Sequence, residues 1–173
     1  TDDVEEVTNY LQAFNWAQEQ LRSDTGLPIS VRMLSEAHRL LLNGVRGTGK
    51  QPGELRRSQN WIGGSRPGTA VFVPPADQVP SLLADLERYI HADQPDLPVL
   101  VRIALVHAQF ETIHPYLDGN GRIGRLLIAI LLEHWQLLPE PLMYLSGFLK
   151  QHQSEYYRRL SIIRTEGDWE TWS

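Results

Sequence analysis

One stretch organises the sequence: Thr112-Ile-His-Pro-Tyr-Leu-Asp-Gly-Asn-Gly-Arg-Ile-Gly-Arg125, followed at once by the apolar run Leu126-Leu-Ile-Ala-Ile-Leu-Leu132. Residues 99–110, just before it, are also apolar and repeat with the period of a helix. The polar residues in between therefore predict a tight loop clamped between two buried helices, with the end of the loop forming the first turn of the second helix.

The loop contains residue types that bind phosphate. Gly119-Asn120-Gly121 can adopt positive φ angles and bring backbone N–H groups close to a ligand. A helix that begins after such a loop offers unpaired N–H groups and the positive end of its dipole to an anion. Arg122 and Arg125 are neighbours on the helix surface, so both can reach the same anion.

Two further residues of the loop carry chemistry. Asp118 offers oxygen ligands beside the phosphate site, which is the usual setting of Mg²⁺. His114 precedes Pro115, which should end the first helix there, and its imidazole can take a proton near neutral pH. Each residue alone is also explained as a helix end, a turn, a cap or a solvated face. Their combination favours a nucleotide phosphate site with its own base.

The segment His114-Pro-Tyr-Leu-Asp-Gly-Asn-Gly-Arg-Ile-Gly-Arg125 resembles the signature of the Fic family, HPFx(D/E)GNGRxxR, with Tyr116 in place of the usual Phe. Residues 57–63, 70–75 and 156–160 are also similar to features of that family. The resemblance implies an all-α, Fic-type helical bundle with a short β-hairpin flap beside the active-site loop. It also implies AMPylation, which is the transfer of AMP from ATP to a Tyr, Ser or Thr hydroxyl of a target protein with release of pyrophosphate.

The same resemblance assigns roles to the residues of the loop. It makes His114 the general base and Asp118 the ligand of Mg²⁺, with Arg122 at the leaving pyrophosphate and Arg125 at the γ-phosphate. The implied nucleotide-binding residues are Gly119, Asn120, Gly121, Arg122, Ile123, Gly124 and Arg125.

The clearest strand pattern in the chain is Thr69-Ala-Val-Phe-Val73, bounded by Gly68 and Pro74. As a structural element alone, such a strand would cover the core. The resemblance implies that it is the flap, which would pair with a segment of the target protein through main-chain groups and place a hydroxyl near His114. The implied flap residues are Thr69, Ala70, Val71 and Phe72.

The composition limits the remaining choices. The 173 residues fit a single domain, 1–173, which we expect to be part of a longer chain. The net charge of −5 argues against a nucleic-acid-binding surface. The lack of cysteine and of an apolar run of transmembrane length favours a cytoplasmic protein without a membrane partner. The resemblance also allows a homodimer and auto-modification.

Apolar spacing predicts further helices. A first helix should end near Arg22, a second should start after Ser30 as N-cap and stop at Asn43-Gly44, and a third should hold Pro80 in its first turn. The buried stripe expected for the first helix consists of Val4, Val7, Leu11, Phe14 and Leu21.

Several single residues are given structural roles. We expect His38 on the surface of its helix and His107 in the core. We expect Arg56 and Asn60 to pin a long loop against the body of the protein, with Trp61 partly buried.

Two motifs leave alternatives open. Gly44-Val-Arg-Gly-Thr-Gly-Lys50 matches the first part of a P-loop, but Gln51 follows where Ser or Thr is needed and no strand precedes it, so a surface loop is preferred. Residues 156–159, Tyr-Tyr-Arg-Arg, either close the adenine end of the site or form an amphipathic helix face.

One feature of the resembling family is missing. Many Fic proteins carry an inhibitory helix, (S/T)xxxE(G/N), whose Glu pairs with the second arginine of the signature, and residues 161–167 miss this pattern by one residue. We therefore expect the inhibitor to lie outside this chain and basal auto-AMPylation to be high. The rival functions are deAMPylation, phosphorylation or phosphocholine transfer on the same scaffold, and an idle module that binds peptides on the flap.

Overall fold

The computed structural model describes residues 2–44, 49–63, 73–93, 96–138 and 144–172. In these residues the chain forms helices and no strand, which confirms the predicted all-α fold. The elements are α1 (Asp2–Arg22), α2 (Val31–Leu41), the 3₁₀ turn η1 (Ala76–Gln78), α3 (Val79–His91), α4 (Val99–Ile113), α5 (Asn120–His134), α6 (Tyr144–Gln151) and α7 (Gln153–Glu166).

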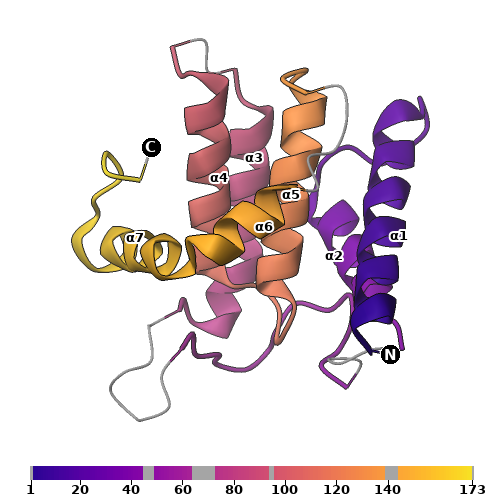
Figure 1. Cartoon of the computed structure of the whole chain (residues 1–173), viewed down its shortest axis with the longest axis horizontal. Coiled ribbons are helices and arrows are strands. Elements are labelled where there is room, and N and C mark those ends of the chain that lie inside the picture. Colours follow the sequence, from indigo (N-terminus) through magenta and orange to yellow (C-terminus); the bar gives the residue numbers. More distant parts are fainter. Residues whose placement is uncertain (1, 45–48, 64–72, 94–95, 139–143, 173) are drawn as a thin grey trace.

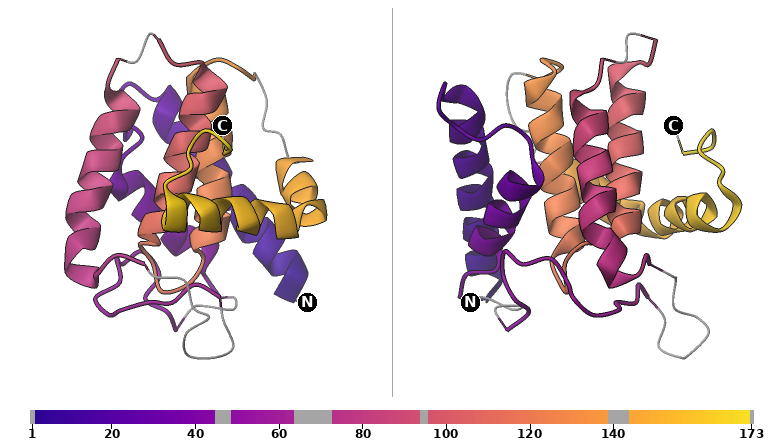
Figure 2. Two further views of the ribbon diagram at one scale, coloured as in Figure 1. Left: turned by 90° about the vertical axis from the view of Figure 1, so that its left-hand side faces the viewer. Right: turned by 180° about the vertical axis from the view of Figure 1, so that it is seen from behind.

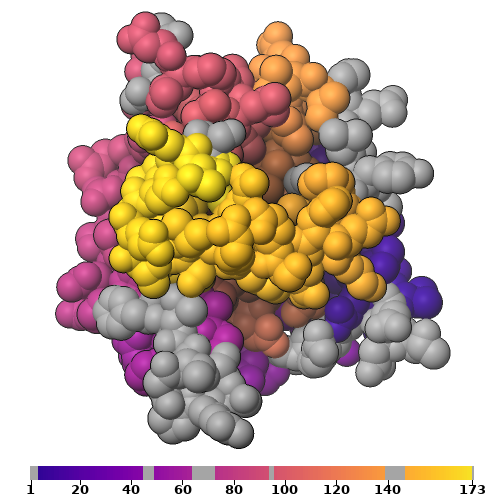
Figure 3. Space-filling model, turned by 60° about the vertical axis from the view of Figure 1, so that its left-hand side comes forward, coloured from indigo at the N-terminus to yellow at the C-terminus, as the bar shows by residue number. Residues whose placement is uncertain are grey.

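The helices α4 and α5 stand side by side at the centre of the molecule (Figure 1). The pair α1 and α2 covers one side of α5, and α3 packs against α4 on the other side. The helices α6 and α7 run across α4 and α5 in Figure 1, and the left view of Figure 2 shows α7 crossing in front of the central helices. On the face seen in Figure 3, the C-terminal part of the chain lies over these central helices. In the described residues no helix is long and apolar enough to cross a bilayer.

Among the described helices, α5 contributes more residues to the core than any other. Its inner face is fully buried, as expected for a helix flanked by others, and the side chains that it contributes include Ile123, Leu126, Leu127, Ile130 and Leu131. Phe110 and Ile113 of α4 are equally buried and belong to the same cluster. The sequence that carries the polar loop is therefore also the sequence that holds the bundle together.

The predicted helix ends at α2 and α3 are confirmed. Ser30 caps α2, because its Oγ accepts a hydrogen bond of 3.2 Å from the Met33 N–H. Gly44 follows that helix with a φ of 70°, a conformation that glycine adopts without strain. Pro80 lies in the first turn of α3, where its missing N–H costs nothing.

The predicted stripe of α1 is wrong in the first half of the helix. Val4, Val7 and Leu11 are 66%, 56% and 37% exposed, and the burial begins at Ala13 and Phe14. Asn9 takes the inner position instead, and its Nδ2 donates to the carbonyl of Asn43 at 2.7 Å. The first turns of α1 therefore meet the polar C-terminal end of α2, which needs a donor and not an apolar side chain.

The predicted flap residues, Thr69, Ala70, Val71 and Phe72, lie outside the described residues, and Val73 belongs to no strand. The flap therefore stays a prediction. Trp61 was expected to be partly buried, and this was wrong: it is 64% exposed. Asn60 beside it anchors the segment, because its Nδ2 donates to the Tyr116 carbonyl at 3.1 Å.

Arg56 fixes the long loop to the centre of the fold, as predicted. It is only 2% exposed, and its guanidinium donates to the carbonyls of His114 (2.7 Å), Pro74 (2.6 Å) and Ile113 (3.2 Å). Its own N–H donates to the Pro115 carbonyl at 2.9 Å. One buried arginine therefore satisfies several carbonyls at the point where α4 ends.

Replacing Arg56 with alanine should lower the free energy of unfolding by about 3 kcal/mol, because it leaves buried carbonyls without donors. Arg57→Ala is the matched control: that side chain is 86% exposed and 3.7 Å from Glu54, so the effect should stay within about 0.5 kcal/mol. Urea denaturation of the two variants measures the difference. Equal stability of the two would contradict the role given to Arg56.

Candidate functional site

The site is centred on the turn between α4 and α5. His114 ends α4 in the left-handed conformation, with φ 49° and ψ 63°, and its N–H donates to the Phe110 carbonyl at 3.0 Å. This agrees with the prediction that Pro115 excludes its neighbour from the α region. The left-handed cap turns the chain sharply, so that His114 lies beside the start of the next helix.

Asn120 closes the turn from inside. Its side chain is 2% exposed, with Oδ1 accepting from the Tyr116 N–H at 2.9 Å and Nδ2 donating to the Tyr116 carbonyl at 2.8 Å. The side-chain amide is thus occupied by the turn, and only the backbone N–H of this residue is left to meet a ligand. Tyr116 itself is fully buried, with its hydroxyl 3.1 Å from Ser35 Oγ.

The first turn of α5 is open to an anion. Gly119 is its N-cap residue, with a φ of 79°, and no side chain caps the helix. The Gly119 N–H donates to Asp118 Oδ1 at 2.6 Å, which fixes that carboxylate at the mouth of the turn. The uncapped N–H groups and the helix dipole together favour a negative ligand at this point.

The two arginines of the stretch lie at this helix start, as their spacing predicts. The Nη1 of Arg122 is 3.7 Å from Glu6 of α1, and its Nη2 is 4.0 Å from Asp118 Oδ1. The Nη1 of Arg125 folds back over Gly121, 3.2 Å from the position that a Cβ would take there. The helix start thus carries two positive charges and one carboxylate in reach of each other.

The ring of His114 is neutral at physiological pH, which is the state that a proton acceptor requires. Its Nδ1 is buried without a hydrogen-bond partner, and burial, with the charges of Arg164 and Arg56, lowers the pKa of the ring to about 4. A ring with this pKa is neutral at every pH above about 5, so it can accept a proton throughout the physiological range.

Three residues of the site were not found from the sequence. His38 was expected on the helix surface, and this was wrong: it is fully buried and stacks on Tyr116 with 3.9 Å between ring centroids. Its Nδ1 accepts from the Gly53 N–H at 2.8 Å, so its Nε2–H donates to the Asp118 carbonyl at 2.9 Å. The spacing of His38 from Leu34 and Leu41 already places it on the apolar stripe of α2.

The other two are Glu111 and Arg164. Glu111 is one turn before His114 on α4 and is 6% exposed. Arg164 of α7 donates from Nη2 to the Glu111 carbonyl at 3.0 Å and lies close enough to His114 to lower the pKa of its ring. Nothing in the local sequence of α7 indicates this contact, which depends on how α7 crosses α4.

His107 is a core residue, as predicted. It is 2% exposed, and its Nδ1–H donates to the Gly124 carbonyl at 3.2 Å while its Nε2 accepts from the Tyr156 hydroxyl at 2.8 Å. Burial lowers its pKa to about 4. Tyr156 is therefore engaged with the core, and Arg158 pairs with Glu155, as an amphipathic helix face requires; the adenine end of the site stays a prediction.

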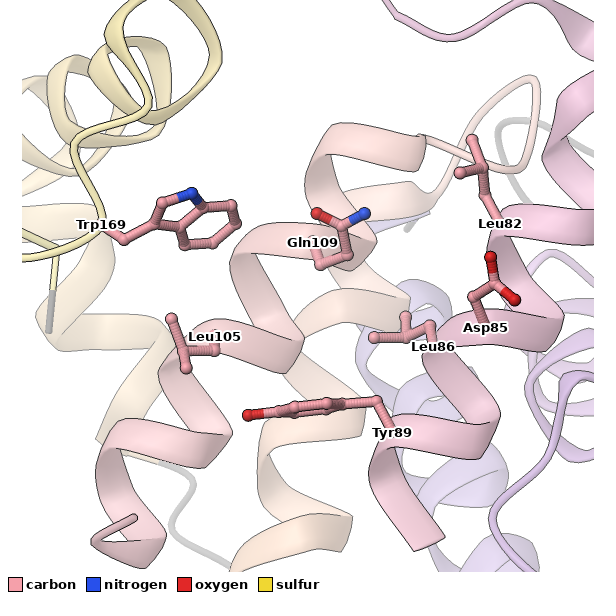
Figure 4. Close-up of a pocket in the computed structure, with 7 residues that line it drawn as sticks. All are labelled: Leu82, Asp85, Leu86, Tyr89, Leu105, Gln109 and Trp169. Atoms are coloured by element: carbon pink, nitrogen blue, oxygen red, sulfur yellow. The ribbon is translucent and has the colours of Figure 1, made fainter. Parts of the chain in front are cut away.

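Two other candidate sites do not compete with the turn. Within Gly49–Ile62 no helix follows Lys50, so the P-loop interpretation lacks the structure that it needs. An apolar pocket of about 490 Å³ lies between α3 and α4 beneath Trp169, and Figure 4 shows its lining. Its polar members are Asp85, Tyr89 and Gln109, and none of the lining residues belongs to the turn.

The chain matches the description Fic/DOC family over residues 28–132, a span that includes the whole turn. The chain belongs to this family. It is 34% identical over 141 residues to a protein adenylyltransferase Fic of Culex quinquefasciatus, covering 81% of this chain and 25% of that protein. It is 32% identical over 143 residues to the protein of the same name in Drosophila grimshawi, covering 82% and 26%.

Solved structures of Fic proteins have the same fold as this chain. A Fic family protein from Desulfovibrio desulfuricans G20 superposes with a TM-score of 0.76 at 29% identity, covering 98% of this chain and 48% of that one. The Fic-1 protein of C. elegans, in its E274G form, superposes with a TM-score of 0.67 over 96% of this chain and 45% of that one. This Fic domain thus spans about a quarter of the curated relatives' length and about half of the solved chains' length.

The glycines of the Fic signature differ in their surroundings, and we therefore expect alanine substitutions to change the free energy of unfolding by different amounts. A Cβ at Gly124 would lie closer than 3.0 Å to Glu111 Oε1, inside the packed interface of α4 and α5. A Cβ at Gly121 would meet the end of the Arg125 side chain at 3.2 Å and Glu111 Oε1 only at 4.0 Å, which is an ordinary contact distance. Gly124→Ala should therefore lower the free energy of unfolding by about 2 kcal/mol.

Gly121→Ala is the matched comparison. Alanine favours a helix by about 1 kcal/mol, so this variant should be as stable as the unchanged protein or slightly more so. Urea denaturation of both variants measures the two values. If Gly121→Ala were the less stable of the two, the contact between Glu111 and the helix start would not be the reason for Gly124.

Proposed function

We propose that this Fic domain is the catalytic part of a protein adenylyltransferase, which transfers AMP from ATP to a Tyr, Ser or Thr hydroxyl of a target protein. The observation that carries the proposal is the pairing of a neutral, half-buried His114 with an uncapped helix start that holds Arg122 and Arg125. The name of the relatives, protein adenylyltransferase Fic, supports the same reaction.

The phosphates of ATP would bind at the first turn of α5. The backbone N–H groups of Asn120 and Gly121 face this position without a side-chain cap, and they would hold the α- and β-phosphates together with the rest of the 119–125 segment. Arg122 would bind the part that leaves as pyrophosphate, and Arg125 the γ-phosphate. Arg122 would exchange its contact with Glu6 for a contact with phosphate, since both are anions.

The residues present fit a magnesium ion that arrives with the nucleotide. Among the described residues no group of three or more His, Cys, Asp or Glu side chains could hold a metal. Asp118 offers a carboxylate at the mouth of the turn, 41% exposed, and Mg²⁺ commonly takes one or two carboxylates with phosphates and water. Asp118 would hold the ion, which when bound offsets the negative charge that develops on the leaving group.

The transfer then needs one proton acceptor. His114 would take the proton of the target hydroxyl, and its Nε2 is the nitrogen for this step because Nδ1 is buried. The hydroxyl oxygen forms a bond to the α-phosphorus, and the bond from that phosphorus to the oxygen bridging to the β-phosphate breaks. The products are the AMP ester of the target, pyrophosphate and a protonated His114.

The target would be presented by the flap, residues 69–72, which would hold a segment of the target protein by main-chain pairing. A second copy of the domain, or the domain itself, would also be a target, which gives auto-AMPylation. Mass spectrometry of a target protein incubated with ATP and Mg²⁺ tests the reaction. A gain of AMP supports the proposal, whereas a gain of phosphate alone or an unchanged mass contradicts it.

Replacing His114 with alanine should reduce AMP transfer by about 10²–10⁴-fold, because the proton acceptor is lost, and should leave ATP binding nearly unchanged. His134→Ala is the control, since this histidine is exposed at the far end of α5. The mass assay measures transfer, and calorimetry measures binding. Transfer at the original rate by His114→Ala would refute the assignment of the base.

Replacing Arg125 with alanine should raise the KM for ATP by roughly 10- to 100-fold, because a charged hydrogen bond to the γ-phosphate is lost. The affinity for AMP should stay the same, since AMP has no γ-phosphate. Arg88→Ala on α3 serves as the control, because Arg88 pairs with Asp85 away from the turn. An equal loss of ATP and AMP affinity would remove Arg125 from the γ-phosphate.

A further inference from the structure

Glu111 is a buried acid that the proposed reaction does not use. It lies on α4, one turn before His114, and is 6% exposed. Its Oε1 is buried and has no hydrogen-bond partner. A buried polar atom without a partner costs folding free energy, so a carboxylate in this state calls for a role beyond packing.

The carboxylate lies against the glycines in the first turns of α5. The nearest atom to a Cβ placed on Gly124 would be Glu111 Oε1, and a Cβ on Gly121 would lie 4.0 Å from the same oxygen and 3.2 Å from Arg125 Nη1. These two glycines are one turn apart in α5. Glu111 Oε1 and Arg125 Nη1 thus both lie within 4.0 Å of one point on the glycine face of the helix start, and the charge of Arg125 favours the ionised carboxylate.

Charges from each element packed around Glu111 act on it. Arg125 of α5 and Arg164 of α7 both favour its ionised form, and Tyr156 of α7 faces it as a neutral hydroxyl. On α4 itself, His107 lies against the same Gly124 position, at 3.1 Å through its Cε1, and His114 is one turn away. Burial outweighs the two arginines and raises the pKa of Glu111 to about 7.

We propose that Glu111 is a positioning residue for ATP: its carboxylate holds the Arg125 guanidinium against the glycine face of α5, aimed at the phosphate site. The proposal rests on the proposed function, because it assumes that Arg125 meets the γ-phosphate. Without the carboxylate, the long side chain of Arg125 would be free to turn towards solvent, and ordering it would weaken ATP binding.

A change of pH switches this attraction. Below neutral pH the carboxylate of Glu111 is protonated, and its pull on Arg125 is lost. The folded-state pKa of about 7 exceeds that of an unfolded glutamic acid, so the neutral form is favoured by folding. Stability therefore falls as the pH rises from about 4.5 to 7, and the ionised, destabilising form is the one that positions Arg125. Above neutral pH the domain is thus less stable, but its Arg125 side chain is better positioned.

The test is Glu111→Gln, which keeps the shape of the side chain and removes the charge. At pH 8 we expect the affinity for ATP to fall roughly fivefold, the affinity for AMP to stay unchanged, and thermal stability to rise. The affinity of the unchanged protein for ATP, relative to that of the variant, should decline between pH 8 and pH 6. The titration of ATP itself is common to both proteins and cancels in this ratio.

A double-mutant cycle separates positioning from a general structural role. On the Arg125→Ala background, Glu111→Gln should have no further effect on ATP affinity, because it acts through Arg125. Glu111→Asp, which keeps the charge, should retain part of the affinity. Equal losses on both backgrounds, equal losses for ATP and AMP, or a constant ratio between pH 8 and pH 6 would each overturn the proposal.

The two proposals fail in different ways. If the unchanged protein binds ATP but transfers no AMP, the proposed function is wrong, and the cycle on ATP affinity still decides the role of Glu111. If ATP does not bind at all, the positioning role is wrong as well. If AMP transfer occurs and the cycle shows no coupling, only the role of Glu111 is refuted.

Discussion

The turn between α4 and α5 is buried on its carbonyl side and open on its amide side, and the rest of the site depends on this division. The carbonyls of His114 and Tyr116 are taken by side chains of Arg56 and Asn120, and that of Asp118 by His38. The first N–H groups of α5 receive no side-chain cap. Two donors from distant segments and one from the turn itself thus satisfy the carbonyls on one face, and the other face is left with the polarity that attracts an anion.

The buried polar groups around this turn are costly for the stability of the fold. Arg164 keeps its Nε without a partner, Glu111 its Oε1 and His114 its Nδ1, all in the space between α4, α5 and α7. A core of the same shape made from apolar residues would be more stable. The apolar inner face of α5 offsets this cost, because the helix that presents the site also contributes more buried residues to the core than any other described helix.

The sequence predicts the parts of this arrangement that depend on local order. The signature, the helix starts at Ser30 and Pro80, and the end of α4 at His114 follow from residue types and their spacing. Arg56 could be recognised as an anchor because the backbone carbonyls of a long, glycine-rich loop need hydrogen-bond donors. These features are decided within a few residues of the chain, where backbone geometry and capping leave little choice.

The features that were missed depend on contacts between distant segments. The exposure of Val4 and Val7 follows from what α1 meets at the end of α2, and the contact of Arg164 with Glu111 follows from the path of α7. Trp61 was judged by its size, although Asn60 beside it makes the anchoring bond. His38 is the exception, because the apolar period of α2 already places it on the buried face of that helix. It was assigned to the surface because its side chain is polar.

The double use of α5 limits how the domain can diversify. Ile123 and Leu127 lie in the core, and Arg122 and Gly124 on the same turns serve the site, so a substitution at either kind of position disturbs both. Changes in reactivity that leave the fold intact must therefore arise at the periphery. Glu6 of α1 is such a position, since it touches Arg122 from an element whose outer face is free to vary. Substitutions that change reactivity without loss of the fold are therefore expected in the outer segments, and not in α5.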